Sequence, residues 1–329
     1  MKIGIAINET WAFFHEIYED LKTHHVVNVF EPHKIQFPIL RERLQKSQFE
    51  NQLKKFIASH DVMFFEWASE LLVAATRLPK TKPIVTRLHR YELYQWAHQI
   101  DWQKVDRIIL VSEAKREEFN QRFPGQNEKI RVIPEAVNPE NFFYEPRIFK
   151  KNIGILGHLT PRKRVYELIL AFAELELDKR GYLLHIGGGA HPRFLDYYDA
   201  VINLPSRLGI EKSVFFYGHI PNPADFHKKI EIFVSNSYSE GLQVSPMEAI
   251  LSGCYCFAHY WPGAKELLPK ENLFYTDEEF GQKILKFENL PDHEKQACQY
   301  QLRSQILEKC NSSLVSRQVR ECIEEVKSI

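Results

Sequence analysis

The strongest constraint on the fold is an alternation of strand-like and helix-like segments that runs through the first half of the chain and then starts again. Stretches rich in β-branched and aromatic residues predict strands at Lys2–Ile7, His25–Phe30, Asp61–Glu66, Pro83–Arg87, Arg107–Val111, Ile130–Ile133, Asn152–Leu156, Tyr182–Ile186, Ser213–Tyr217, Ile232–Ser235 and Cys254–Ala258. Amphipathic stretches between them, such as Glu113–Phe123 and Arg162–Leu175, predict helices. Such alternation is typical of parallel sheets with helices on both faces, so we expect an α/β chain with two Rossmann-like, doubly wound domains.

The join between the two domains is predicted at Asn138–Lys150, which is rich in Pro, Asn and aromatic residues and lacks periodicity. We therefore expect an N-terminal domain of residues 1–145 and a C-terminal domain of residues 146–329. The stretch from about Glu288 onward reads as helical, and its last helices either stay in the second domain or pack back on the first. Ligands of open α/β sheets bind at the carboxyl ends of the strands, so the chemistry is expected in strand-to-helix loops facing a cleft between the domains.

Charge and cysteine usage narrow the class of protein. Lys and Arg number 43 and Asp and Glu also number 43, a balance that argues against nucleic acid as a partner. No apolar run approaches the roughly 20 residues that span a bilayer, and the short apolar start reads as a strand rather than a signal peptide. The five cysteines form no CxxC pair or metal spacing, and Cys254 and Cys256 are expected to be buried thiols. We expect a cytoplasmic protein.

One local stretch departs from neutrality. Residues 41–60 carry five Lys and Arg side chains against two Glu, with apolar residues at roughly helical spacing. One interpretation is a surface helix with a solvated basic face. The other is a patch for an anionic membrane surface or an acidic acceptor, which would make the protein peripheral at the inner face of the membrane.

The most informative segment is Ser237–Gly253. Its local pattern predicts a helix with Ser245 as N-cap, Pro246 at the first helical position and Glu248 three residues after the cap, which is a capping-box arrangement. Gly253 suits the left-handed residue that ends such a helix. In this interpretation the Glu248 carboxylate only accepts a hydrogen bond from the backbone amide of Ser245.

A second interpretation of the same segment is a ligand site. Glu240 and Gly241 precede the helix in a polar loop, and Gly241 allows the backbone to approach a ligand closely. The amides around Leu242 and Gln243, with the helix N-terminus beyond, suit a diphosphate. A carboxylate beside a diphosphate repels it unless the carboxylate accepts hydrogen bonds from sugar hydroxyls. In this interpretation Glu240 and Glu248 accept such bonds.

Here the chain resembles glycosyltransferase family 4, a family of retaining enzymes with the GT-B fold. Glu240 and Glu248 match the E-x7-E motif of that family, with Ser-Glu-Gly ahead of the helix and Ser-Gly closing it. The segment Ile153–Val165 resembles the family's Gly-Arg-Leu-x-x-x-Lys-Gly segment, whose Arg and Lys clamp the donor diphosphate. Lys163 falls on the family Lys, whereas His158 stands in place of the Arg and Arg164 in place of the Gly. Arg162 or Arg164 could substitute for the missing Arg.

Further landmarks follow from the resemblance. The loop Gly218-His219-Ile220 is similar to the family loop that lies near the nucleotide base, and Gly187–Gly189 to a neighbouring one. His89 ends a strand as in the family segment His-Asp, whose His reaches the transferred sugar near the leaving phosphate, although Arg90 here replaces the Asp. With 14 histidines in the chain, a purely structural His89 is the alternative.

The resemblance implies a GT-B enzyme that transfers a sugar from a nucleotide-diphosphate donor, most commonly a UDP- or GDP-sugar. The acceptor would be a glycan, a lipid-linked molecule or another compound in surface polysaccharide or glycoconjugate synthesis. No Asp-x-Asp motif is present, so neither a metal nor another cofactor is expected. The family resemblance implies that Lys163 binds the diphosphate, that Glu248 binds the ribose, and that Glu240 and His89 contact the transferred sugar. The alternatives are another GT-B enzyme, such as a nucleotide-sugar epimerase or a phosphorylase, and a non-catalytic partner subunit.

Overall fold

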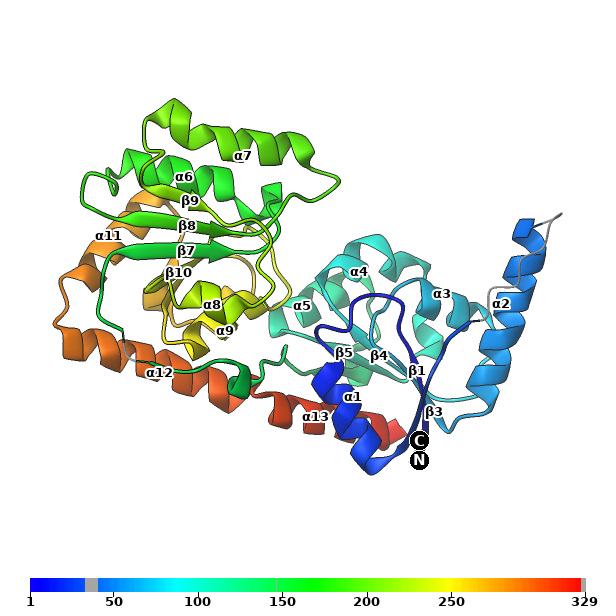
Figure 1. The fold of residues 1–329 in the computed structure, drawn as a ribbon. Coiled ribbons are helices and arrows are strands. Elements are labelled where there is room, and N and C mark those ends of the chain that lie inside the picture. Colours follow the sequence, from blue (N-terminus) through cyan, green and yellow to red (C-terminus); the bar gives the residue numbers. More distant parts are fainter. Residues whose placement is uncertain (33–40, 146, 327–329) are drawn as a thin grey trace. The chain divides into compact units, whose positions relative to one another are not determined.

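The computed structural model describes residues 1–32, 41–145 and 147–326, without the side chains of residues 41–44. The chain divides into two compact units, of which unit 1 comprises Met1–Ala136 with Ser312–Ile329 and unit 2 comprises Val137–Asn311 (Figure 1). The sequence predicts a boundary at residue 145 and leaves open which domain the terminal helices join. Here the last helix belongs to unit 1.

Unit 1 is built on a six-stranded sheet whose strands all pair in parallel. Its elements are β1 (Lys2–Ala6), α1 (His15–His24), β2 (Val26–Val29), α2 (Arg41–Ala58), β3 (Val62–Phe65), α3 (Glu70–Arg77), β4 (Ile84–Leu88), α4 (Arg90–Gln95), β5 (Arg107–Leu110), α5 (Glu113–Arg122), β6 (Ile130–Val132) and α13 (Ser312–Glu325), with short 3-10 helices at Ala97–Gln99, Trp102–Lys104 and Asn127–Lys129. The strand order is β2-β1-β3-β4-β5-β6. The order reverses between β1 and β3, as in a doubly wound fold, and all six strands predicted for this half are confirmed.

Both faces of this sheet are buried, which explains why its strands read as continuous apolar runs. In β3, Val62 and Phe64 belong to one apolar cluster, whereas Met63 and Phe65 belong to another. The first cluster is completed by α1 and α13 and the second by α2, α3 and α5. Successive side chains of a strand point to opposite faces, so each strand serves both layers.

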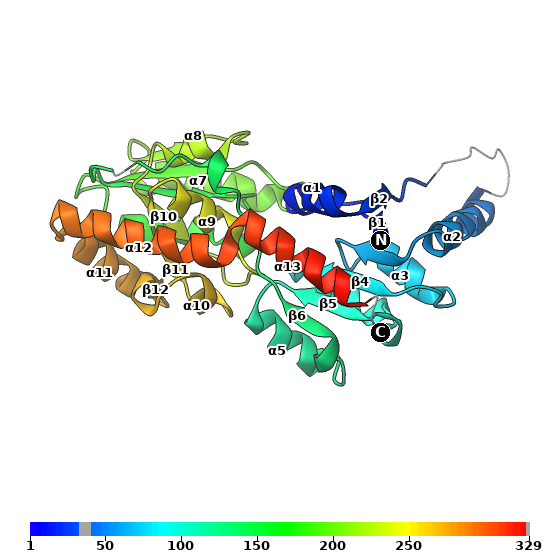
Figure 2. The same ribbon diagram turned by 90° about the horizontal axis from the view of Figure 1, so that it is seen from below.

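The last helix is fixed to the start of the chain. Helix α13 packs on α1 and lies across the sheet beside β5 (Figure 2). Arg320 donates to Asp20 at 2.9 Å, and the ring of His25 lies 2.9 Å from Glu324. The C-terminal helix therefore supplies part of the core of the N-terminal unit.

Unit 2 contains a second parallel sheet of six strands. Its elements are β7 (Asn152–Leu156), α6 (Val165–Glu174), β8 (Leu183–Gly187), α7 (Leu195–Leu208), β9 (Val214–Phe216), α8 (Pro223–His227), β10 (Ile232–Ser235), α9 (Val244–Leu251), β11 (Tyr255–His259), α10 (Ala264–Leu267), β12 (Leu273–Phe274), α11 (Asp277–Glu288) and α12 (Asp292–Cys310), with short 3-10 helices at Pro139–Asn141, Pro161–Lys163 and Lys270–Asn272. The order β12-β11-β10-β7-β8-β9 reverses between β7 and β10, with α6 and α7 on one face and α8 and α9 on the other (Figure 1). The predicted α/β class with two doubly wound sheets is confirmed.

Two details of the elements differ from the prediction. Strand β12 was not expected, because two residues are too few to show a period. The helix expected over Arg162–Leu175 is a 3-10 turn at Pro161–Lys163 followed by α6 from Val165. Arg164 between them has φ +50° and ψ +43°, a left-handed conformation that interrupts an α-helix. The helical C-terminal stretch is confirmed as two helices, since α12 ends at Cys310 and α13 begins at Ser312.

The basic stretch forms helix α2, whose first four side chains lie outside the described residues. Lys46, Lys54 and Lys55 are exposed, whereas Leu53 and Ile57 are buried in the core of unit 1. The buried positions thus have a packing role, and the suggested contact with a membrane surface stays a prediction. Within the described ranges, no helix combines the length and apolar character needed to cross a bilayer.

Candidate active site

The site predicted in unit 2 forms where the strand order reverses. The loop after β7 and the loop after β10 are neighbours there, and hydrogen bonds to backbone carbonyls hold them together. The amide of Tyr238 donates to the carbonyl of Arg162 at 3.2 Å, and the side chain of Asn236 donates to the carbonyl of Arg164 at 2.9 Å. The second of these bonds fixes the left-handed residue that separates the 3-10 turn from α6.

Glu240 is the centre of this site. Lys163 Nζ lies 2.7 Å from Glu240 Oε1, and Arg162 lies 2.5 Å from Glu240 Oε2. Ser237 donates to Oε1 at 2.6 Å, and Arg162 also donates to the carbonyl of Ser239 at 2.9 Å. Two of the predicted donor-site residues, Arg162 and Lys163, are therefore in direct contact with a third, Glu240.

The surroundings keep Glu240 ionised. Burial by itself would raise the pKa of this carboxyl, but the charges of Lys163 and Arg162 outweigh it and lower the pKa to about 2. Glu240 is only 7% exposed, so its charge is neutralised mainly by these two side chains rather than by water. The site contains two cations that are both paired with a single carboxylate of the protein.

Glu248 lies in α9, and the capping box expected for it was wrong. Helix α9 begins at Val244, one residue before the predicted N-cap Ser245, and Gln243 occupies the N-cap position without a side-chain capping bond. Within the described part of the chain no hydrogen bond or ion pair reaches the Glu248 carboxylate, and burial raises its pKa to about 7. The expected end of the helix is confirmed, since Gly253 has φ +90°.

The residues between the two carboxylates are buried. Gly241, Leu242 and Gln243 are shielded from solvent just ahead of α9, and Ser235 donates a hydrogen bond to the Gln243 side chain. That bond fixes the amide side chain at the end of β10, so Gln243 serves the loop in this structure. Its contact with a donor, like those of Gly241 and Leu242, stays a prediction.

Gly188, in the loop after β8, is required by close packing. The amide of Gly188 donates to the carbonyl of Gly218 at 2.7 Å, which brings the two loops together. Gly188 has φ +131°, and a Cβ atom there would lie 1.9 Å from the carbonyl oxygen of Gly157. Only glycine fits this close approach of the loops after β7 and β8. His219 is exposed and Ile220 partly exposed beside them.

His158 is exposed at the start of the same group of loops. Its ring meets the ring of His191 edge-on, with 6.0 Å between centroids. Its pKa is lowered, first by partial burial of the ring and then by electrostatic effects of the neighbouring His191, His219 and Lys163. The residue that stands in place of the family Arg is therefore held towards its neutral form in this structure.

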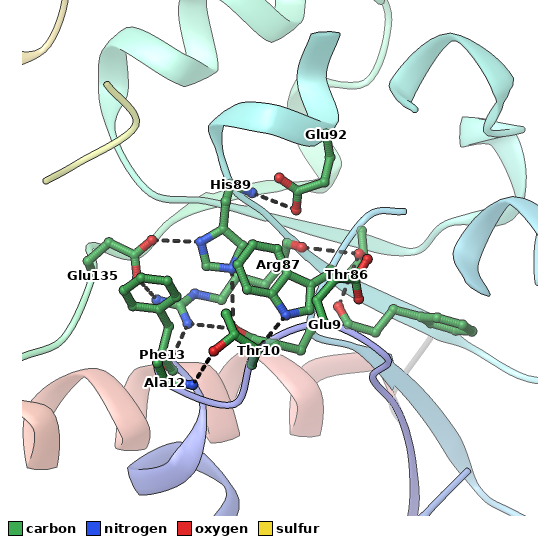
Figure 3. A network of polar contacts seen from close by, with 12 residues as sticks. Glu9, Thr10, Ala12, Phe13, Thr86, Arg87, His89, Glu92 and Glu135 are labelled. Carbon is green, nitrogen blue, oxygen red and sulfur yellow. Dashed lines mark hydrogen bonds and ion pairs between the residues drawn. The ribbon is translucent and has the colours of Figure 1, made fainter. Parts of the chain in front are cut away.

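His89, the site residue predicted in unit 1, lies in a buried ion network (Figure 3). Its Nδ1 lies 2.6 Å from Glu135 Oε1 and its Nε2 lies 3.2 Å from Glu66 Oε1. Arg87 donates to Glu66 at 2.9 Å and to Glu135 at 2.5 Å. Both ring nitrogens of His89 are thus held by carboxylates of the protein, while its ring packs on Trp67 with 4.1 Å between centroids.

This network keeps His89 charged. Burial would lower the pKa of the imidazole, but Glu135 and Glu66 raise it to about 10. With His89 protonated, two cations and two carboxylates cancel, whereas a neutral imidazole would leave one buried negative charge uncompensated. Sequence reasoning missed the roles of Glu66, Arg87 and Glu135. The available signal was a charged residue at the carboxyl end of each of two neighbouring apolar strands.

The comparisons with known proteins agree with the fold and the motifs. The model of the family described as "Glycosyl transferases group 1" matches residues 141–303, and that of "Glycosyltransferase Family 4" matches residues 12–141. The chain therefore belongs to the family 4 type of glycosyltransferases.

Two curated relatives come from Campylobacter jejuni and Staphylococcus aureus. The first, N-acetylgalactosamine-N,N'-diacetylbacillosaminyl-diphospho-undecaprenol 4-alpha-N-acetylgalactosaminyltransferase, is 27% identical over 55% of this chain and 47% of the relative. The second, poly(ribitol-phosphate) alpha-N-acetylglucosaminyltransferase, is 27% identical over 45% of this chain and 29% of the relative. The chain thus spans about half or less of the length of these relatives.

Solved structures resemble the chain over almost its whole length. HepE from Anabaena, in complex with UDP and glucose, has a TM-score of 0.74 at 18% identity and covers 98% of this chain and 99% of its own. Sucrose-phosphate synthase from Thermosynechococcus elongatus has a TM-score of 0.77 at 16% identity and covers 99% of each chain. At such identities the likeness establishes the fold, which is GT-B.

Proposed function

We propose that this protein is a retaining, metal-independent glycosyltransferase that moves a sugar from a UDP- or GDP-sugar to a glycan or lipid-linked acceptor in surface polysaccharide or glycoconjugate synthesis. The observation that carries the proposal is the group of Lys163, Arg162 and Glu240 where the strand order reverses in unit 2. Ligands of open α/β sheets bind at this position. The relatives named above transfer N-acetylhexosamines to a lipid-linked diphosphate glycan and to poly(ribitol-phosphate), which supports an acceptor of this kind.

The proposed roles follow from charge. Lys163 and Arg162 turn from Glu240 to the donor diphosphate, whose negative charge grows as the bond to the sugar breaks. Glu240 then accepts hydrogen bonds from hydroxyls of the transferred sugar, and Glu248, which has no partner among the described residues, accepts those of the ribose. His158 and the loop Gly218–Ile220 lie beside the nucleotide.

The proposed chemistry needs no side chain as nucleophile. The bond between the anomeric carbon and the phosphate oxygen breaks, and the acceptor oxygen forms its bond to the same face of that carbon. The acceptor proton passes to the leaving phosphate oxygen, so the anomeric configuration is retained. In unit 1 the imidazolium of His89 offers a fixed positive charge, and a place near the transferred sugar is proposed for it by resemblance.

A thermal-shift screen tests the donor site. UDP, GDP, ADP and dTDP, with their sugar conjugates, are added to the protein in the presence of EDTA. A nucleotide at about 100 times its dissociation constant adds roughly 2.7 kcal/mol to the free energy of unfolding. We expect one base to stabilise the wild type and not Lys163→Ala, while Lys212→Ala, at an exposed lysine of unit 2, behaves as wild type.

Two outcomes would contradict the proposal. Stabilisation that survives in Lys163→Ala would place the nucleotide elsewhere. A response that EDTA abolishes would contradict metal independence. If a donor is found, the anomeric configuration of the product, read by NMR coupling constants, tests retention directly.

A further inference from the structure

A second hollow lies at the far edge of the unit 2 sheet. Its volume is ≈ 770 Å³, and it is lined mainly by Tyr260, Tyr275, Lys265, Lys270, Lys283 and Lys286. Strand β12 forms the sheet edge here, and β11 and β10 separate it from the loop after β7 that carries Lys163. No residue of the proposed donor site lines this hollow. We call it the Tyr–Lys hollow.

Strand pairing sets the two tyrosines side by side. Tyr260 directly follows β11 and Tyr275 directly follows β12, and the amide of Tyr260 donates to the carbonyl of Phe274 at 2.8 Å. Their rings stack with 4.5 Å between centroids and 16° between planes. Tyr275 is 60% exposed, although its ring is large and partly apolar. With Tyr260 partly exposed as well, the pair presents aromatic surface to solvent rather than forming part of a core.

The lysines of the hollow have no acidic partner among the described residues. Lys265 lies on α10, Lys270 begins the 3-10 helix after it, and Lys283 and Lys286 lie one turn apart on α11. None of the four forms an ion pair with a carboxylate in the described ranges, whereas Lys151, on the same unit, pairs with Glu288 at 2.7 Å.

The carboxylate that lines the hollow belongs to Glu279, and it accepts a hydrogen bond from the backbone amide of Tyr275 at 2.7 Å. The hollow thus gathers four cations around one carboxylate that is already bound. Like charges held close together repel, and an anionic ligand would relieve that repulsion.

The shape and the residue types select the ligand. A hollow of this size suits a ligand of two or three rings. A sugar ring has an apolar face that fits a tyrosine ring and hydroxyls that fit the Gln282 amide, which also lines the hollow. The four lysines sit on three separate elements, which suits several anionic groups along a chain better than a single phosphate. We propose that the Tyr–Lys hollow binds a short segment of an anionic glycan.

The experiment uses the full chain and isothermal titration calorimetry at near-physiological salt. The probes are a heparin hexasaccharide, maltohexaose as a neutral glycan, and a short inorganic polyphosphate as an anion without sugar rings. The variants are Tyr275→Ala and the double variant Lys265→Ala/Lys286→Ala, all at exposed positions, with Lys212→Ala as the matched lysine control. Circular dichroism confirms that each variant is folded.

We expect the hexasaccharide to bind most tightly. Its affinity should fall about tenfold or more in Tyr275→Ala and in the double lysine variant, and stay unchanged in the control. No binding of the hexasaccharide would overturn the proposal. If polyphosphate bound as tightly as the hexasaccharide and Tyr275→Ala had no effect, the hollow would bind anions only through general charge attraction, which would contradict the proposal.

Binding to phosphatidylglycerol vesicles that is lost in the same variants, with no hexasaccharide binding, would assign the hollow to a lipid surface instead. This inference goes beyond the proposed function and does not depend on the donor site. Lys163→Ala should leave hexasaccharide binding unchanged, so a failure at either site is recognised separately.

Discussion

The buried network around His89 makes a quantitative prediction for Glu135→Gln. This substitution keeps the size of the side chain but removes the carboxylate that contacts both Arg87 and His89. The remaining carboxylate, Glu66, cannot compensate two buried cations. We therefore expect His89 to lose its proton near neutral pH and unit 1 to become less stable.

The magnitude follows from the shifted titration of His89. The ordinary pKa of 6.5 is raised to about 10 in the folded protein, against the opposing effect of burial, and Glu135 is the first contributor to the rise. A shift of that size corresponds to about 5 kcal/mol, which both carboxylates together supply. Removing one partner of a buried ion pair costs roughly 3–5 kcal/mol, so we expect Glu135→Gln to lower the free energy of unfolding by about 3 kcal/mol.

The pH dependence has a definite sign. Below pH 6.5 the folded and unfolded chains both hold the His89 proton, and the stabilisation from its ion pairs is fully present. As the pH rises from 6.5 through about 10, only the folded chain must retain the proton, and this stabilisation is lost. In Glu135→Gln most of that loss should be absent, so the wild type and the variant should converge at alkaline pH.

Urea denaturation followed by tryptophan fluorescence is the assay. Four of the five tryptophans lie in unit 1, namely Trp11, Trp67, Trp96 and Trp102. Glu113→Gln is the control, because this exposed carboxylate pairs with Arg116 at 2.6 Å and such pairs contribute about 1 kcal/mol or less. Burial raises the pKa of Glu92 to about 7 and the charge of His89 lowers it, so Glu92 contributes to the difference between the two proteins near that pH.

Equal stabilities of Glu135→Gln and the wild type below pH 6.5 would refute the reasoning, as would a difference that stays constant through pH 10. The first result would mean that the ion pairs only offset the cost of burying their own charges. The second would mean that the proton on His89 does not depend on Glu135.

Three further predictions concern unit 2. Arg164→Gly should be more stable than Arg164→Ala by up to about 1 kcal/mol in thermal unfolding, because φ at this position is +50°. Gly188→Ala should destabilise the unit by roughly 2 kcal/mol or prevent folding, because its Cβ would lie 1.9 Å from the carbonyl oxygen of Gly157, and an unchanged melting temperature would contradict this. Glu248→Gln should stabilise the ligand-free protein by on the order of 2 kcal/mol above pH 7, because the raised pKa of Glu248 makes the wild-type free energy of unfolding fall as pH rises from 4.5 through about 7. The same substitution should weaken nucleotide binding.

The fold could be predicted because its signals are local. Both sheets are buried on two faces, so each strand appears as an apolar run, and all eleven predicted strands are present. The failures lie where local signals are weak or compete. Strand β12 has only two residues, too few for a recognisable pattern. Ser245 and Pro246 predicted a capping box, but α9 begins earlier, at Val244.

The candidate site was predicted unevenly for a similar reason. Lys163 and Glu240 were found because they sit in motifs, and the structure brings them to 2.7 Å of each other. The partners of His89 could not be paired from the sequence, since Glu66 and Glu135 lie 23 and 46 residues away and meet only when β3, β4 and the segment after β6 align. Ion pairs between residues that are distant in the sequence therefore became visible only in the folded structure.

The contact between Lys163 and Glu240 has a consequence for ligand affinity. In this structure the two cations proposed to hold the diphosphate are both paired with Glu240, whose pKa of about 2 reflects those contacts. A diphosphate must therefore compete with a carboxylate of the protein for the same charges. Because a fixed carboxylate next to a diphosphate is also repulsive, the competition weakens the binding of a nucleotide that carries no sugar.

Glu240→Gln should expose this competition. We expect it to bind a nucleoside diphosphate alone at least as tightly as the wild type, up to about tenfold tighter, because the internal anion is gone. The nucleotide sugar should lose its advantage over the bare nucleotide, because the carboxylate that accepts bonds from the sugar hydroxyls is also gone. Calorimetric titration of both ligands gives the two affinities, with Ser237→Ala as a control that removes one hydrogen bond to Glu240 but not its charge. Loss of bare-nucleotide binding in Glu240→Gln would mean that Glu240 positions Lys163 for the diphosphate rather than competing with it.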